Sequence, residues 1–162
     1  MFDRVYQSST ALDGQGIAGT IAEARERALR MYRQTRAEGT TSRLWATLRG
    51  RPSTLRELTA DQLAAGRRAG HAAGIRAVPI AQIHGSESRA DDFDAGFHPR
   101  HDLSRDRWMS VAEARLRGVA LPRVTLIQIG GVYYVRDGHH RISVARALGE
   151  AYVDAEVVVW EG

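Results

Sequence analysis

The segment from residue 132 to residue 148 constrains the fold of this 162-residue chain more than any other part of the sequence. The apolar run Val132–Val135 is typical of a strand, and Asp137-Gly138 is typical of a sharp turn. The apolar residues that follow recur at helical spacing and end at Gly149, a common helix terminator. The sequence therefore predicts a strand that turns at a glycine directly into a helix.

Three side chains on the first turn of that predicted helix are suited to bind an anion. His139, His140 and Arg141 directly follow Gly138. Backbone N–H groups at a helix N-terminus have no partner within the helix, and the helix dipole is positive there. The Arg141 guanidinium adds a planar fork that matches phosphate oxygens. This geometry predicts a phosphate site.

From residue 76 onward the predicted elements alternate between strands and helices. They are a strand at 76–83, an acidic loop at 84–106, a helix at 107–117, strands at 121–129 and 132–136, a helix at 139–148 and a strand at 152–160. Gly130-Gly131 between two apolar runs indicates a hairpin. We therefore expect a small α/β (α+β) domain with a mixed sheet at 76–162, preceded by a helical, arginine-rich extension at 1–75.

The extension is expected to begin with a loose polar arm at 1–16. An amphipathic helix should follow at 17–38 and stop at Gly39, and Ser53 should cap a further helix. The first of these helices carries many arginines, which either form a solvated face with Glu–Arg pairs or bind nucleic acid. Residues 1–76 hold 13 Arg against 7 acids, so this half of the chain carries most of the positive charge.

Composition excludes several classes of protein. All 23 basic residues are arginine, which reflects either a GC-rich genome or selection for phosphate contacts. The absence of lysine excludes a P-loop, and the absence of cysteine excludes thiol catalysis and thiolate metal sites. No apolar stretch is long enough to span a bilayer and no leader is evident, so we expect a cytoplasmic, bacterial protein without a membrane partner.

Asp137-Gly138-His139-His140-Arg141, which closes a strand and opens a helix, resembles the motif of the ParB/sulfiredoxin superfamily. The resemblance covers residues 76–160 and is closest to the form found in ADP-dependent free-serine kinases. It implies a ParB/sulfiredoxin-like fold and a nucleotide (ATP, ADP or CTP) bound through its phosphates. By this resemblance Gly138, His139, His140 and Arg141 form the nucleotide site, with Gly138 allowing close approach and His140 and Arg141 contacting oxygens.

The chain departs from the family at two places. The sulfiredoxin branch has a nucleophilic cysteine where His139 stands, so sulfinic-acid repair by that route is excluded. The serine-kinase branch has a His-Glu pair after its first strand, whereas His84 and Glu87 are separated here by two residues.

The acidic loop after the first strand could supply catalytic carboxylates. Four acids lie between residues 87 and 94. The loop is either an ordinary solvated segment or faces the phosphate site, with Glu87 as general base, Asp92 and Asp94 holding Mg²⁺, and Asp137 beside the phosphate motif. Phe93, Phe97 and Trp108 are expected to anchor this region, with adenine stacking as the alternative.

These residues and the resemblance support two hypotheses about the function of the protein. The leading hypothesis is a nucleotide-phosphate-binding protein of the superfamily, with Mg²⁺-dependent phosphoryl transfer or nucleotidase activity. The alternative is a non-enzymatic, ParB-like module that is associated with DNA or binds a nucleotide as a regulator. Because the chain ends after the last predicted strand, a complete partition protein with a helix-turn-helix is not expected.

Overall fold

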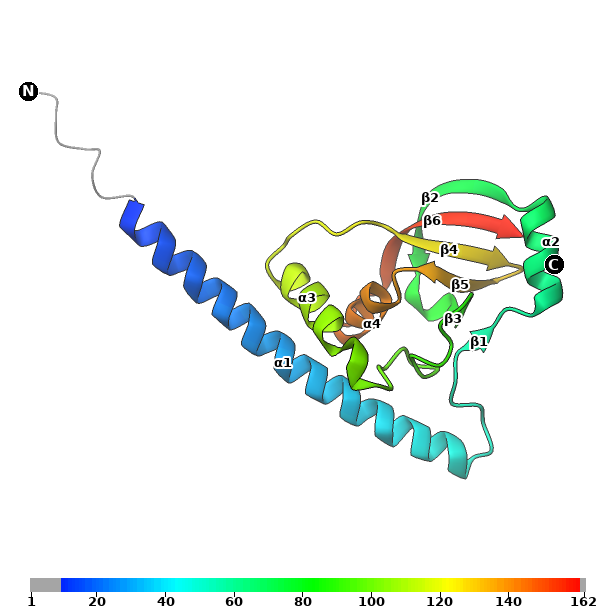
Figure 1. The fold of residues 1–162 in the computed structure, drawn as a ribbon, viewed down its shortest axis with the longest axis horizontal. Helices are drawn as coiled ribbons and strands as arrows, with labels where there is room; N and C mark the ends of the chain where they lie inside the picture. Colours follow the sequence, from blue (N-terminus) through cyan, green and yellow to red (C-terminus); the bar gives the residue numbers. More distant parts are fainter. Residues whose placement is uncertain (1–9, 161–162) are drawn as a thin grey trace, which may run out of the picture.

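A six-stranded mixed sheet forms the centre of the protein (Figure 1). The computed structural model describes residues 10–160 of the chain, with the side chains of residues 20–66 and 69–160. The strands lie in the order β1-β3-β5-β4-β6-β2. Their bounds are β1 Arg56–Glu57, β2 His71–Pro79, β3 Ile83–Ser86, β4 Val124–Ile129, β5 Val132–Asp137 and β6 Tyr152–Trp160.

Both parallel and antiparallel pairs occur in this sheet. β4 and β5 form the predicted hairpin through residues 130–131, and β4 also pairs in parallel with β6. β3 pairs in parallel with β5, and β2 pairs antiparallel to β6. The predicted fold class, a mixed α/β domain with a helical N-terminal part, is confirmed. Strands from before and after residue 75 belong to this one sheet. The predicted boundary between an extension at 1–75 and a domain at 76–162 remains a prediction.

Helices cover the sheet in successive layers. The four α-helices within residues 10–160 are α1 Thr10–Leu48, α2 Ala60–Ala69, α3 Arg105–Leu116 and α4 His139–Ala147, and short 3₁₀ turns lie at Ile80–Gln82 and Asp102–Ser104. α4 packs on the sheet, α3 on α4, and the middle of the long α1 on α3 (Figure 1). Trp108 of α3, fully buried, joins Ala28 and Tyr32 of α1 to Val144 of α4 in one apolar cluster. The ends of α1 extend past this contact.

Gly39 does not stop the first helix, so that prediction was wrong. α1 continues to Leu48. A Cβ at Gly39 would lie 2.6 Å from Cβ of His98. The glycine therefore serves close packing of the loop at 94–98 against the helix, and the helix does not need it as a terminator. Residues 10–16 of the predicted arm are helical, and residues 1–9 lie outside the described residues.

The predicted helix start at Ser53 was also wrong. α2 begins after Thr59, whose side chain accepts a hydrogen bond from the backbone N–H of Gln62 while the Gln62 side chain bonds back to the Thr59 backbone. Leu55 and Leu58, which follow Ser53, are buried from the extended chain around β1. Gly74, with φ 79°, marks a bulge in β2.

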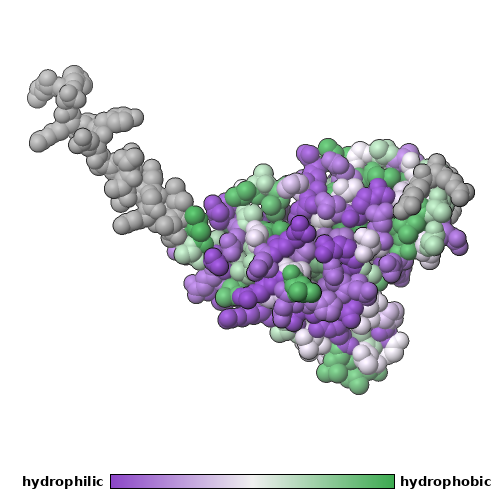
Figure 2. Space-filling view, viewed as in Figure 1, coloured by the Kyte–Doolittle hydropathy of each residue, from purple (hydrophilic) through white to green (hydrophobic). Residues whose placement is uncertain are grey.

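The C-terminal end of α1 carries an exposed apolar patch. Leu44, Trp45 and Leu48 are between 55% and 69% exposed. Figure 2 shows this apolar surface at the tip of the helix, apart from the hydrophilic surface over the body of the molecule. Within residues 10–160, no helix combines the length and the apolar character that a membrane crossing requires.

Candidate functional site

The predicted phosphate site lies at the N-terminus of α4, and Gly138 forms the turn into that helix. Gly138 adopts φ 103°, a left-handed conformation that favours glycine. A Cβ at this position would meet Val124 Cγ1 at 2.6 Å, so space also requires the glycine. Within the described part of the chain, no side chain caps the N-terminus of α4. The free N–H groups of its first turn can therefore bind an anion.

His139 is buried behind this turn as a neutral acceptor. Its Nε2 atom lies 2.8 Å from Oγ of Ser86, a fully buried residue at the end of β3. The backbone N–H groups of Ser88 and Arg89 both donate to the same Oγ. Because those donors occupy the oxygen lone pairs, the Ser86 hydroxyl hydrogen points to Nε2, and the imidazole proton is then on Nδ1. This bond fastens the loop after β3 to the start of α4.

His140 supplies a buried polar atom without a partner. Its Nε2 atom is buried and has no hydrogen-bond partner among the described residues. The His139 ring stacks on Phe93 at 6.0 Å between centroids, and the His140 ring meets the same phenyl edge-on at 5.3 Å. Phe93, Phe97 and Trp108 are at most 1% exposed, so their predicted role as anchors is confirmed.

Burial and positive charge keep both histidines neutral. Burial lowers the pKa of His139 to about 4, and the charge of Arg89 acts in the same direction. Burial likewise lowers the pKa of His140 to about 4, with Arg89 and Arg107 adding to the effect. The same positive charges that oppose protonation of the imidazoles would attract an anion to this place.

Because the two histidines are buried and neutral, we expect the unfolding free energy of the protein to fall in mild acid. Their folded-state pKa of about 4 lies below the ordinary value of 6.5, so the unfolded chain binds more protons between these pH values. The contribution of the two neutral histidines to the unfolding free energy is fully present above pH 6.5 and falls as the pH is lowered toward 4. The slope approaches about 1.4 kcal/mol per pH unit for each histidine. Urea unfolding at a series of pH values measures this slope.

His140→Phe is expected to flatten that pH dependence, because it removes one of the two groups. The exposed His101→Phe serves as the control and should keep the wild-type slope. An unchanged slope in His140→Phe would contradict the assignment.

Arginines from four parts of the chain line a basic pocket of about 210 Å³ at this helix N-terminus. Its lining consists of Arg89, Arg107, Val111, Arg136, Asp137, Gly138, His139, His140 and Arg141. Arg89 follows β3, Arg107 lies in α3, Arg136 in β5 and Arg141 in α4. Arg107 is exposed and forms no ion pair or side-chain hydrogen bond with the described residues. Four guanidinium groups and one carboxylate line the basic pocket, and the arginine without an ion pair among the described residues, Arg107, leaves it with a positive charge that would attract an anion.

Arg141, predicted to hold the phosphate, is also tied to the chain around it. Its Nη1 atom donates to the carbonyl oxygens of Pro122 and Arg123, the latter at 2.6 Å, and its Nη2 atom donates to Asp137 at 2.5 Å. The side chain is 17% exposed. Arg141 thus holds the segment before β4 against α4 while it lines the basic pocket.

The two predicted catalytic carboxylates each bond an arginine of the basic pocket. Glu87 accepts two hydrogen bonds from Arg136, at 2.9 and 3.3 Å. Asp137 accepts from Arg141 and remains 70% exposed. In this arrangement both acids position guanidinium groups, and their catalytic roles remain predictions.

The two predicted metal ligands differ in exposure and in partners. Asp92 accepts from Nε of Arg89 at 2.7 Å and is partly exposed. Asp94 is buried and accepts from the backbone N–H groups of Gly96 and His98, from Nδ1 of His98 and from Nη1 of Arg43. Burial alone would raise its pKa, but the His98 bonds outweigh that effect and the pKa of Asp94 is lowered.

Among the residues whose positions are described, no three His, Asp or Glu side chains are grouped to hold a metal ion. The side chains do not form a magnesium site by themselves, and a metal there would need phosphate oxygens as further ligands. The metal assignment therefore remains a prediction.

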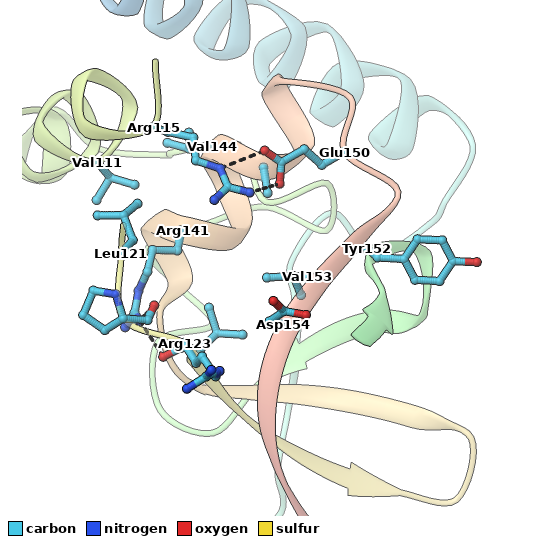
Figure 3. A pocket seen from close by; sticks show the side chains of 13 residues that line it. Val111, Arg115, Leu121, Arg123, Arg141, Val144, Glu150, Tyr152, Val153 and Asp154 are labelled. Atoms are coloured by element: carbon cyan, nitrogen blue, oxygen red, sulfur yellow. Dashed lines mark hydrogen bonds and ion pairs between the residues drawn. The ribbon is translucent and has the colours of Figure 1, made fainter. Parts of the chain in front are cut away.

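A second, larger pocket also borders Arg141 (Figure 3). This side pocket has a volume of about 400 Å³. It is lined by Val111, Arg115, Leu121, Pro122, Arg123, Val124, Arg141, Val144, Ala145, Glu150, Tyr152, Val153 and Asp154. Arg115 and Glu150 form a two-bond ion pair at one end of it.

Sequence reasoning missed several residues of the site. Ser86, Arg89, Arg107 and Arg136 lie outside the Asp-Gly-His-His-Arg motif and carry no local pattern that marks them. Ser86 and Arg89 fall in the predicted acidic loop, for which facing the phosphate site was one of two alternatives, and this position in the sequence was the available signal. On the arginine-rich helix, Glu26 and Arg30 form an ion pair at 2.9 Å, one of the Glu–Arg pairs that a solvated face would have, and nucleic-acid binding by that helix remains a prediction.

Comparison with known proteins adds little to this description. No family model and no curated protein sequence matches the chain. A solved structure of sulfiredoxin from Arabidopsis thaliana is similar over 54% of this chain and 86% of its own length, with 18% sequence identity and a TM-score of 0.38. At these values no residue role is transferred from that protein.

Proposed function

We propose that this protein binds a nucleotide through its phosphates in the basic pocket. The observation that carries the proposal is the convergence of four arginines on the uncapped N-terminus of α4, above two buried neutral histidines. Three of these arginines already have acidic partners, and Arg107 has none within the described residues. An incoming phosphate would supply the missing partner.

The donors in the basic pocket suit phosphate better than a carboxylate. Phosphate offers several oxygens, and guanidinium groups on α3, α4, β5 and the loop after β3 surround the pocket. Charge-assisted N–H···O bonds are about twice as strong as neutral ones, and the helix N-terminus adds backbone donors. His140, kept neutral, can offer a ring N–H without adding to the local positive charge. The pocket volume of about 210 Å³ suits phosphate groups and leaves the rest of a nucleotide outside.

Arg107→Ala is the sharpest test because this side chain has no structural partner to lose. We expect nucleoside diphosphate and pyrophosphate affinity, measured by calorimetry, to fall about 10-fold, the effect of one hydrogen bond to a charged group. The melting temperature without ligand should stay unchanged. Arg117→Ala, at the exposed C-terminal end of the same helix and outside the basic pocket, is the matched control and should bind as the wild type does.

Two results would overturn the proposal. One is the absence of any ligand-induced thermal shift with nucleotides or pyrophosphate, since a ligand of the native state must raise apparent stability. The other is equal loss of binding in Arg107→Ala and Arg117→Ala. Retention of duplex DNA that falls steeply with salt, without any effect of nucleotide, would instead favour the DNA-associated alternative.

A further inference from the structure

The side pocket forms where β6 extends beyond β4. β4 begins at Val124, which pairs with Ala155 of β6, so the start of β6 has no partner on that side. The chain segment at 121–123 passes in front of this gap and is held there by Arg141. The result is a pocket of about 400 Å³ between the helices α3 and α4 and the beginning of β6 (Figure 3).

The walls of the side pocket combine apolar side chains with two charged groups that lack partners. Val111, Val144 and Leu121 give it an apolar side. The charges of Arg115 and Glu150 are satisfied by each other. Asp154 and Arg123 form no hydrogen bond or ion pair through their side chains within the described part of the chain, and Asp154 acts on Arg115 only through its charge.

An unpaired carboxylate selects against phosphate and in favour of hydrogen-bond donors. An ionised aspartate only accepts hydrogen bonds, and it repels an anion. At Asp154 the side pocket therefore favours a hydrogen-bond donor such as a hydroxyl, whereas Arg123 in the same lining keeps a positive charge. Both pockets are lined by Val111 and Arg141, so they are adjacent.

We propose that the side pocket receives the nucleoside part of the nucleotide whose phosphates lie in the basic pocket, and that Asp154 accepts a hydrogen bond from a ribose hydroxyl. The apolar wall would contact the flat base, and Asp154 would distinguish ribonucleotides from deoxyribonucleotides. In dinucleotide-binding sites, an acidic side chain commonly accepts a hydrogen bond from a ribose hydroxyl. This inference rests on the proposed function and adds the ligand class and its orientation.

The test compares three probes on the wild-type protein and on two variants by calorimetry. The probes are the tightest-binding of the four common ribonucleoside diphosphates, its 2′-deoxy analogue and pyrophosphate. The variants are Asp154→Ala and its control Glu156→Ala, an exposed acid two residues along β6 and outside the side pocket. Wild-type protein should bind the ribonucleotide about 10-fold more tightly than the deoxy analogue. Asp154→Ala should remove this preference and leave pyrophosphate binding unchanged, and Glu156→Ala should behave as the wild type.

The outcomes separate this inference from the proposed function. If pyrophosphate binds as tightly as the ribonucleotide, or if Asp154→Ala keeps the ribose preference, the side pocket does not hold the nucleoside, while the phosphate site stands. If none of the probes binds, the proposed function fails first. If the wild-type protein prefers one base but binds the ribonucleotide and its 2′-deoxy analogue equally, the role given to Asp154 is also overturned.

Discussion

Arg141→Ala is expected to weaken nucleotide binding strongly and to lower the stability of the free protein. The guanidinium lines both pockets and bonds two carbonyl oxygens and one carboxylate. Loss of a charge-assisted contact to phosphate costs about 1.5–3 kcal/mol, which is roughly a 10- to 150-fold loss of affinity. Calorimetry with a nucleoside diphosphate measures the affinity, and urea unfolding measures the stability.

Arg141→Lys separates charge from geometry at this position. A lysine retains one positive charge but lacks the planar fork that reaches the carbonyl oxygens of Pro122 and Arg123 together with Asp137. We expect the lysine variant to recover part of the phosphate affinity and little of the lost stability. Wild-type nucleotide affinity in Arg141→Ala would remove this residue from the phosphate site.

Asp94→Ala is expected to cost about 3–5 kcal/mol of unfolding free energy, the usual effect of removing one partner from a buried charged network. The Asp94 side chain is 2% exposed and accepts hydrogen bonds from His98, Gly96 and Arg43. It thereby joins the loop after β3 to helix α1. Urea unfolding of the variant measures the loss.

Asp91→Ala is the matched control, because its side chain in the same loop is 98% exposed. It should change the stability by less than about 0.5 kcal/mol, as surface substitutions do. The lowered pKa of Asp94 gives a second check, with the sign worked out from linkage. Its stabilising effect is present above the ordinary pKa of 3.8 and is lost as the pH falls below it. Equal stability of the two variants would show that Asp94 does not hold the loop.

The elements from residue 105 onward were predicted closely, because their signals are local. The hairpin at Gly130-Gly131 depends on two adjacent glycines, and α4 begins after Gly138 and ends before Gly149. Neither feature needs information from distant parts of the chain. The N-terminal half was predicted less well, since Gly39, taken as a helix stop, serves tertiary packing instead. Gly39 lies inside α1 because the loop at His98 approaches it, and a distant loop leaves no mark at that position.

Local sequence by itself determined the strand, the glycine turn and the helix with its histidines and arginine, and so the place where an anion can bind. Tertiary structure decided which other groups gather there. Parallel pairing of β3 with β5 brings Ser86 beside Val135. Ser86 then bonds both His139 and the backbone of Arg89, so Arg89 lies near the histidines of α4. Packing of α3 on α4 adds Arg107. The two levels differ because turn and helix signals act between residues a few positions apart, whereas convergence of side chains on one pocket depends on which strands pair.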